Sequence, residues 1–425
     1  MSHILITFLG KSEKDNDIYP PERYHFEDDD TKYYETSFFG LAVLEHLAEK
    51  NRKPDKLVVL GTSGSMWDAF FQLSDKLDEY EDDYYDLAEI IENNSQYQEQ
   101  TDVSSYLKTA ETILKEQLKD AVDCELRLIP YGEKQDDQIL ILKEMADCVA
   151  KNDTVSLDIT HGLRHLPMLT VLSAMYLEVV KKVTINGIYY GARDMKHLHD
   201  KVVPAVNLGG LLQIAKWVGA LNSFDKDGDY AVFAKLLEDD GLSSVQTHSL
   251  KEAAFFERNF NISDAARKLA NVYPFVQQGL KGIGKLFSQS LLNRMKWHKM
   301  GADSENNPYH RQRDLAKFYL ENRDYPRAVV FAFEAMITKR MTRDFFNYSA
   351  REAAKNSFES TQYAQRDPNY NQLKELRNVI AHGSISDNEG VGQEKERIQK
   401  LVRGWTKDEE LLQKELKRLM KVLLL

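Results

Sequence analysis

The stretch TVSLDITHGLRHLP, residues 154–167, combines a short apolar run, a polar loop and the start of a helical pattern. Residues 154–159 are mostly β-branched or apolar, which is typical of a buried strand. Thr160, His161 and Gly162 end the apolar run, and helical spacing follows. The order strand, loop, helix predicts one unit of a parallel sheet that is covered by helices.

The same alternation extends through the first half of the chain. Five short apolar runs bounded by turn residues predict strands at 3–10, 56–61, 125–130, 154–159 and 183–192. Helical patterns lie between them, near 36–50, 66–93, 101–121, 135–150 and 165–181. This alternation predicts an α/β, Rossmann-like domain at residues 1–205 that receives its ligand at the carboxyl ends of the strands.

The second half of the chain has a different pattern. From residue 208 onward the apolar residues recur with helical spacing, and no run is typical of a strand. Breaks at 225–229 and around 301–308 divide this half. We therefore expect an all-α connector at residues 206–305 and an all-α terminal domain at residues 306–425.

The composition limits the class of protein. The 425 residues exceed the length at which one core usually keeps growing, and 42% of them are hydrophobic. Cys124 and Cys148 are the only cysteines, without a metal-ligand pattern, so we expect neither a disulfide scaffold nor a metal site. No apolar run approaches the roughly 18 residues that span a bilayer. We expect a soluble, cytoplasmic protein.

Charge is distributed unevenly along the chain. The net charge is −11, but residues 281–425 carry 27 Lys and Arg against 19 Asp and Glu, which is a balance of +8. Residues 1–280 therefore carry −19. A partner that is held through phosphates would be attracted to the basic last third. The alternative is that charge is simply scattered over solvated helices.

Three stretches resemble familiar motifs but lack residues that those motifs require. Residues 279–286 have the spacing of a phosphate loop, but Leu286 stands where Ser or Thr would hold magnesium. Residues 225–229 imitate the start of a calcium loop, but the glycine comes two places early, so we expect a turn between helices. His197 and His199 have no apparent third metal ligand. These patterns argue against a metal or nucleotide-hydrolysis site.

The most informative stretch of the last third is RNVIAHG, residues 377–383. An apolar stripe at helical spacing would pack this helix on a core and leave Lys374, Asn378 and His382 on another face. Arg377 lies about 140° from His382 on an ideal helix. The length of the Arg side chain and a loosened last turn before Gly383 would have to bring the two together.

An Arg and a His that act together suit RNA cleavage by the ribose 2′-hydroxyl. The guanidinium can hold the phosphate and match the charge of the transition state, while an imidazole can move a proton near neutral pH. No metal is needed, because the nucleophile belongs to the substrate. The alternative is that His382 caps the helix beside an exposed Arg377.

Two loops of the first half suit an anionic ligand. GTSGSMWD, residues 61–68, and DITHGLRHLP, residues 158–167, each follow a predicted strand and open a helix. Their small residues would expose backbone N–H groups and hydroxyls. Together with residues 7–12 after the first strand, they predict a phosphate-lined crevice. Each loop could instead be a tight strand-to-helix turn.

These two loops resemble the CARF domains that sense cyclic oligoadenylate in the ancillary nucleases of type III CRISPR systems. The Arg-x4-His pattern, with Asn directly after the Arg, resembles the signature of HEPN ribonucleases. The helix RAVVFAFEAMITKRM, residues 327–341, resembles the first long helix of that fold. The resemblance implies that Arg377 and His382 are catalytic and that Asn378 supports them.

The same resemblance implies a ligand, a partner and a set of contacts. The activator would be a cyclic oligoadenylate, with the tetraadenylate weakly favoured over the hexaadenylate, and no cofactor would be required. A homodimer would place the ligand across the two sensors and single-stranded RNA across the two helical domains. The implied ligand contacts are Gly61, Thr62, Ser63, Gly64, Ser65, Trp67, Thr160, His161, Gly162, Arg164, Tyr190 and Arg193. Lys339, Arg340, Arg343 and Lys374 would hold RNA phosphates, or form a solvated charge cluster.

These observations predict a ligand-activated, metal-independent endoribonuclease of CRISPR antiviral defence. The alternative is a ligand-responsive regulator that binds nucleic acid or protein without cutting. The sequence leaves open the ring size of the activator, the RNA sequence preference and whether the sensor cleaves its own ligand.

Overall fold

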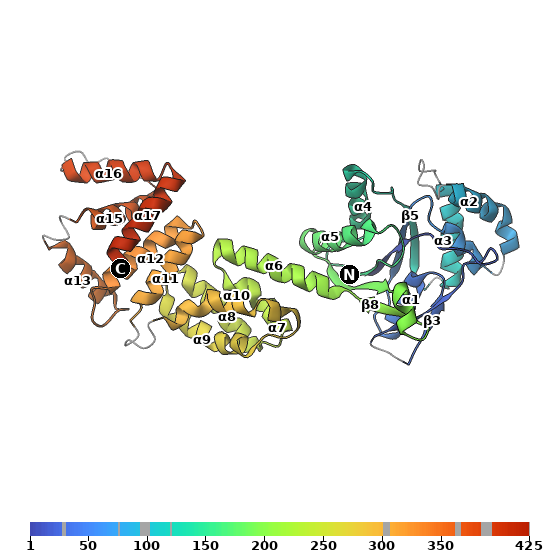
Figure 1. Ribbon diagram of the computed structural model, residues 1–425, viewed down its shortest axis with the longest axis horizontal. Coiled ribbons are helices and arrows are strands. Elements are labelled where there is room, and N and C mark those ends of the chain that lie inside the picture. Colours follow the sequence, from blue (N-terminus) through green and yellow to red (C-terminus); the bar gives the residue numbers. More distant parts are fainter. Residues whose placement is uncertain are drawn as a thin grey trace. The chain divides into compact units, whose positions relative to one another are not determined.

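The chain forms two compact units, Met1–Gln213 and Ile214–Leu425. The computed structural model describes residues 1–27, 31–74, 77–93, 103–119, 121–300, 307–361, 367–383 and 393–424. The first unit is α/β and the second is helical (Figure 1).

The first unit is built on an eight-stranded sheet with the order β3-β2-β8-β7-β6-β1-β4-β5. The strands are β1 (His3–Leu9), β2 (Glu22–Phe26), β3 (Tyr34–Thr36), β4 (Lys56–Gly61), β5 (Asp123–Leu128), β6 (Thr154–Asp158), β7 (Thr184–Gly191) and β8 (Val203–Asn207). The five strands from β7 to β5 in this order run parallel. Strand β8 is antiparallel to β7, and β3 is antiparallel to β2. The predicted Rossmann-like sheet is confirmed.

Helices cover both faces of this sheet (Figure 1). One face packs against α1 (Phe39–Glu49), α2 (Glu81–Asn93) and α3 (Ser104–Gln117), and the other against α4 (Gln135–Asp147) and α5 (His165–Val180). Along β1, Leu5 belongs to the first core and Ile6 to the second, because neighbouring side chains of a strand point to opposite faces. Burial on both faces explains why these strands read as continuous apolar runs.

The prediction for this unit is right for the parallel core and incomplete at one edge. All five predicted strands are present, but β2, β3 and β8 were not predicted. Their sequences, ERYHF, YET and VPAVN, are short or polar and give no apolar run. The helix expected at 66–93 begins instead as two 3-10 turns, η1 (Trp67–Leu73) and η2 (Leu77–Tyr80), before α2. A further 3-10 turn, η4 (Arg193–Leu198), precedes β8.

The second unit contains only helices among its described residues. They are α6 (Gly209–Asp227), which begins in the first unit, η5 (Tyr230–Phe233), α7 (Ala234–Asp239), α8 (Ser244–Arg258), α9 (Ile262–Gln278), η6 (Gly282–Leu286), α10 (Ser288–Met295), η7 (Lys296–Lys299), α11 (Tyr309–Glu321), α12 (Tyr325–Thr338), α13 (Tyr348–Glu359), α15 (Pro368–His382), α16 (Gln393–Trp405) and α17 (Glu409–Leu424). The expected turn at 225–229 is confirmed, since α6 ends there and Gly228 has a φ of 67°.

The predicted connector, 206–305, and the predicted terminal domain, 306–425, share one hydrophobic core. The rings of Phe224 and Phe318 lie 5.8 Å apart, although one belongs to each segment. The two segments therefore do not form structurally separate domains. The prediction that they have different functions stays a prediction. Residues 301–306, where one predicted break lies, are outside the described residues.

No helix in the described part of the chain is both long enough and apolar enough to cross a membrane.

Candidate functional site

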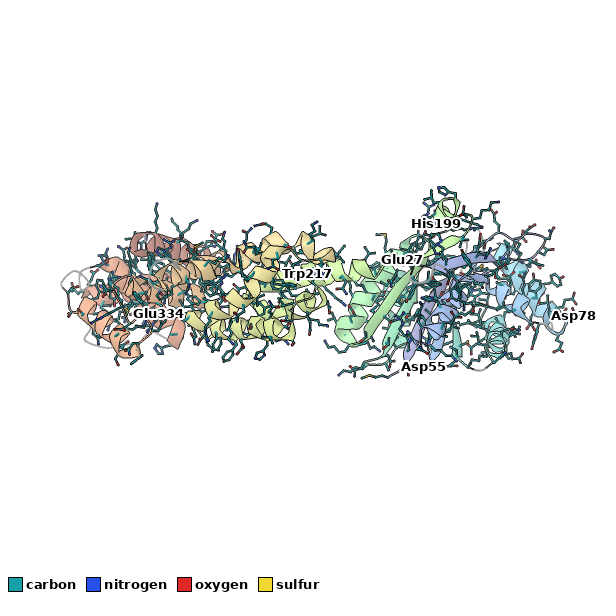
Figure 2. All side chains as sticks on the ribbon, turned by 90° about the horizontal axis from the view of Figure 1, so that it is seen from below. Glu27, Asp55, Asp78, His199, Trp217 and Glu334 are labelled. Atoms are coloured by element: carbon teal, nitrogen blue, oxygen red, sulfur yellow. The ribbon has the colours of Figure 1, made fainter. Side chains whose placement is uncertain are left out.

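The strand order brings several loops together at the carboxyl ends of the parallel strands, where a ligand can bind. From β1 the chain builds outward through β4 and β5 on one side, and then through β6 and β7 on the other. The loops after β4, β1 and β6 therefore meet side by side, and such a switch point is where open α/β sheets bind ligands. Figure 2 shows Asp55, directly before β4, and His199, after β7, at opposite ends of the sheet.

A cleft of about 140 Å³ opens at this switch point. Its lining residues are Leu9, Gly10, Lys11, Thr62, Gly64, Ser65, Tyr131, Gly162, Leu163 and Leu166. They come from the loops after β1, β4, β5 and β6, so the structure brings together the three loops that the sequence singled out.

Hydrogen bonds fix the loop after β4 against the loop after β1. The hydroxyl of Ser65 donates to the carbonyl of Leu9 at 2.7 Å, and the Met66 N–H donates to the carbonyl of Gly10 at 2.8 Å. The N–H of Thr62 donates to the Ser65 hydroxyl at 2.9 Å. These three hydrogen bonds within the protein hold the loop in place.

Ser63 and Trp67 support this loop from the protein interior and do not face the cleft. Both side chains are fully buried. The Ser63 hydroxyl lies 3.1 Å from that of Tyr131, and the Trp67 indole N–H donates to the Thr62 carbonyl at 2.8 Å. Gly61 is equally constrained, because a Cβ there would lie 2.6 Å from the Trp67 ring. The resemblance implied that Gly61, Ser63 and Trp67 contact the ligand. In the structure, these three residues shape the loop.

The loop after β6 is held by a buried carboxylate. Asp158 accepts a hydrogen bond from the Thr7 hydroxyl at 2.5 Å and one from the Thr160 N–H at 2.8 Å. The Thr160 hydroxyl in turn accepts from the Gly191 N–H at 2.7 Å. Burial raises the pKa of Asp158 to about 6. The carboxyl thus ties the ends of β1, β6 and β7 together.

Two glycines let the loops after β1 and β6 touch backbone to backbone. A Cβ on Gly10 would lie 2.4 Å from the amide nitrogen of Gly162. Gly162 itself has a φ of 105°, in a region that side-chain-bearing residues rarely adopt. The cleft can therefore expose main-chain groups of both loops.

The remaining implied ligand contacts differ in their surroundings. The Phe39 N–H at the start of α1 donates to Nε2 of His161 at 3.4 Å. Burial and the charge of Arg193 lower the pKa of His161 to about 4, so the ring is neutral at pH 7. Arg164 is exposed, whereas the Nε of Arg193 pairs with Glu22 at 3.1 Å. Tyr190 is half-buried in the core beneath α5.

In the second unit, α15 packs on α12 and α17 and carries the predicted catalytic residues (Figure 1). The Arg377 guanidinium lies 5.0 Å over the Phe333 ring of α12 and donates to the Asn378 side-chain carbonyl at 2.9 Å. His382 is the exposed last residue of α15. Gly383 ends the helix with a φ of 65° and an N–H bond to the Val379 carbonyl at 2.9 Å.

The loosened last turn that would bring Arg377 and His382 together is not observed. The helix stays regular through His382, so helical geometry leaves the two side chains about 140° apart around its axis. Within one chain, α15 fixes Arg377 beside Asn378 and presents His382 to solvent.

The four cations proposed to hold RNA differ in how closely the fold engages them. Arg340 donates to the Met336 carbonyl at 2.6 Å and stacks 3.8 Å from the Phe358 ring. Lys374 pairs with Glu359 at 2.7 Å. Lys339 and Arg343 are exposed near the end of α12 and are better placed to meet a polyanion.

Comparison with known proteins identifies the first unit. Residues 4–194 match the family model of the CRISPR system endoribonuclease Csx1, CARF domain. The match covers most of the first unit, which is similar to a CARF domain. The resemblance of the two polar loops to this family is thereby confirmed.

A curated relative extends the similarity beyond the CARF domain. The chain is 24% identical over 418 residues to the CRISPR-associated protein MJ1674 of Methanocaldococcus jannaschii, and the match covers 91% of this chain. It covers 63% of the relative, so the chain spans less than two thirds of that protein's length. The chain is therefore similar to the CARF domain of Csx1 over its first unit and to a CRISPR-associated protein over most of its length.

Two polar residues of the cleft, Lys11 and Tyr131, were missed as individual sites. Lys11 is an exposed cation that lines the cleft. Tyr131 lines it from the loop after β5, and its carbonyl lies 2.8 Å from Nε2 of His165. The stretch IPYG, residues 129–132, covers the end of the strand predicted at 125–130 and could have indicated this loop, because β5 is the neighbour of β4.

Proposed function

We propose that this chain is an endoribonuclease that is activated by cyclic oligoadenylate and cuts single-stranded RNA without a metal. The observation that carries the proposal is a preformed cleft of small and polar residues in a CARF domain, on the same chain as an Arg-Asn pair and a helix-terminal His. CRISPR association of the relative supports a role in antiviral defence.

The CARF cleft suits the phosphates and sugars of a cyclic oligonucleotide. Main-chain N–H groups of close-packed loops and the Thr62 hydroxyl can donate to phosphate oxygens. Lys11 in the cleft and the exposed Arg164 beside it add positive charge. Since cations are few, neutral donors supply most of the binding, and the close approach of Gly10 to Gly162 makes them accessible.

The end of α15 suits transition-state stabilisation and proton transfer. The Asn378 side chain holds the Arg377 guanidinium, which limits the side-chain entropy that is lost when the guanidinium binds a phosphate. His382 is exposed, so a substrate can reach its ring. The ribose 2′-hydroxyl attacks the adjacent phosphorus, the 5′-oxygen leaves, and imidazole groups move the protons.

A second copy of the chain would complete this site. One copy leaves Arg377 and His382 on different sides of α15, whereas a twofold axis can bring the Arg of one copy to the His of the other. The CARF domain has a suitable surface for pairing. On α5, Leu172 is 63% exposed and Val179 is 67% exposed, and Met168 continues this apolar stripe one turn earlier.

The second candidate is a ligand-responsive regulator that binds a nucleic acid without cutting it. The separation of Arg377 and His382 within one chain favours this alternative, because it leaves a single copy without a complete site.

Cleavage of labelled single-stranded RNA in EDTA distinguishes the two candidates. The nuclease predicts cleavage on addition of cyclic tetra- or hexaadenylate, with 2′,3′-cyclic phosphate or 3′-phosphate ends and 5′-hydroxyl ends. Bound but intact RNA would favour the regulator. Products with 5′-phosphates that require magnesium would contradict the metal-independent mechanism.

A further inference from the structure

A second cavity, of about 590 Å³, lies within the helical unit and away from α15 in the sequence. Its lining residues are Ser263, Asp264, Ala266, Arg267, Ala270, Tyr273, Pro274, His298, Lys299, Arg311 and Phe346. They come from α9, η7, α11 and the segment before α13. The volume is in the range of pockets that bind small molecules or single nucleotides.

Three cationic side chains line the cavity. Arg267, Lys299 and Arg311 line it, against one acid, Asp264, which pairs with Arg267 at 2.5 Å. Among the described residues, none forms an ion pair or hydrogen bond with the half-buried Arg311. Its Nε is buried, and this burial lowers the pKa of the guanidinium. A buried cation without a partner costs stability unless a ligand supplies the counter-charge.

Aromatic rings lie beside these cations. The Lys299 ammonium lies 3.8 Å from the Tyr273 ring centroid, and Tyr273 lies 4.8 Å from the buried His298. Phe346, at the edge of the cavity, is 55% exposed. Exposed aromatic faces next to cations are the usual means of holding single-stranded nucleic acid, because the rings stack on bases and the cations meet phosphates.

We propose that this cavity binds one nucleotide of a single-stranded RNA, with a phosphate on Arg311 and Lys299 and a base against Phe346. Arg311 supplies the planar donors that suit a phosphate, and its buried Nε has no hydrogen-bond partner among the described residues. Arg267 extends the positive surface outward, which favours a continuing strand over a free mononucleotide. The choice of RNA rests on the proposed function, and the cavity serves as a substrate-holding site separate from α15.

RNA binding by full-length protein tests this proposal. All variants carry His382→Ala and are kept in EDTA, so that only affinity is measured, by fluorescence anisotropy of labelled single-stranded RNA. Arg311→Gln should weaken binding about tenfold, as expected for losing a hydrogen bond to a charged group. It should also lower the salt dependence of the affinity by about 0.7 in log–log slope. Lys251→Gln, which removes an exposed cation on α8 outside the cavity, is the matched control.

Melting temperature separates a binding role from a structural one. Because no residue in the described part of the chain pairs with Arg311, Arg311→Gln should leave the melting temperature unchanged or raise it while RNA affinity falls. Equal RNA affinity of Arg311→Gln and Lys251→Gln would overturn the proposal, as would a fall in affinity accompanied by loss of stability. Binding of AMP as tight as that of RNA would also overturn it. None of these outcomes depends on whether the wild-type protein cuts RNA.

Discussion

Arg377 and His382 lie on the same helix but differ in burial and in contacts. Arg377 is half-buried, stacked on Phe333 and bonded to Asn378, whereas His382 is exposed at the helix end. Arg377→Ala and His382→Ala should each lower RNA cleavage at least about a hundredfold, which is the usual effect of losing an acid-base group or a phosphate-stabilising group. Cleavage is measured with saturating activator.

The control for these variants is Arg397→Ala, which removes an exposed cation on α16. It should retain nearly full cleavage. Near-wild-type cleavage by either Arg377→Ala or His382→Ala would show that α15 is not the active site.

Lys11 is the cation that lines the CARF cleft. Lys11→Gln should weaken binding of cyclic oligoadenylate about tenfold, because a charge-assisted bond to phosphate is lost. Titration calorimetry of the full chain measures this change. Lys151→Gln is the matched control, since Lys151 is exposed before β6, at the opposite end of the sheet. Equal affinity of the two variants would place the ligand elsewhere.

The sequence could locate the loops of the cleft but not the direction of every side chain. GTSGSMW was predicted as a set of ligand contacts, yet Ser63 and Trp67 are fully buried, and Tyr131 and Lys11 complete the cleft. The position of a loop follows from strand order, which apolar runs reveal. The direction of a side chain depends on hydrogen bonds such as that from Trp67 to Thr62, which no local pattern encodes.

At the scale of elements, the apolar stripe on α5 predicts how two copies pair. Leu172→Asp places a charge in the centre of this stripe and should convert a dimer to a monomer, with loss of activated cleavage. Sedimentation velocity measures the change. Tyr85→Asp is the matched control, because Tyr85 is similarly exposed on α2, on the other face of the sheet. A Leu172→Asp protein that stays dimeric would show that α5 is not the interface.

A buried acid between α8 and α11 predicts a pH dependence of stability. Burial raises the pKa of Glu257 from 4.5 to about 8, and the Tyr319 hydroxyl donates to its carboxyl group. The folded chain therefore holds this proton more tightly than the unfolded chain does. The resulting stabilisation is fully present below about pH 4.5 and is lost as the pH rises through about 8.

Glu257→Gln removes this titration and should flatten the fall in melting temperature between about pH 5 and about pH 9. Glu321→Gln, at an exposed acid on α11, should keep the wild-type profile. Parallel profiles for Glu257→Gln and the wild type would contradict a protonated Glu257.

The predictability of the elements follows from burial. Strands β1, β4 and β6 were predicted because they are covered on both faces and are rich in apolar residues, whereas the edge strand β5 contributes only Cys124 and Leu126 to a core. Strands β2, β3 and β8 were missed because they contain no apolar run and are defined by pairing with their neighbours. Strand β8 also contains Pro204, a residue type that argues against a strand. Helices α12 and α15 were predicted from their apolar stripes, which face the shared core.

The proposed function requires that the ligand cleft of the first unit act on the incomplete site of the second. In the proposed dimer, a ligand bound across the two sensor units would act on α15 by changing how the two copies are oriented. Because Arg377 and His382 of one copy lie on different sides of α15, such a change would decide whether Arg377 of one copy meets His382 of the other. The ligand then needs only to bind the assembled arrangement more tightly.

The most direct test measures ligand occupancy and RNA cleavage in the same samples. Cyclic tetraadenylate, or cyclic hexaadenylate in parallel, is titrated into the wild-type protein with labelled RNA and EDTA. We expect almost no cleavage without ligand and a cleavage rate that rises in step with occupancy of the cleft. A rate that does not change as the cleft fills, or a filled cleft with no cleavage at all, would contradict the proposed function.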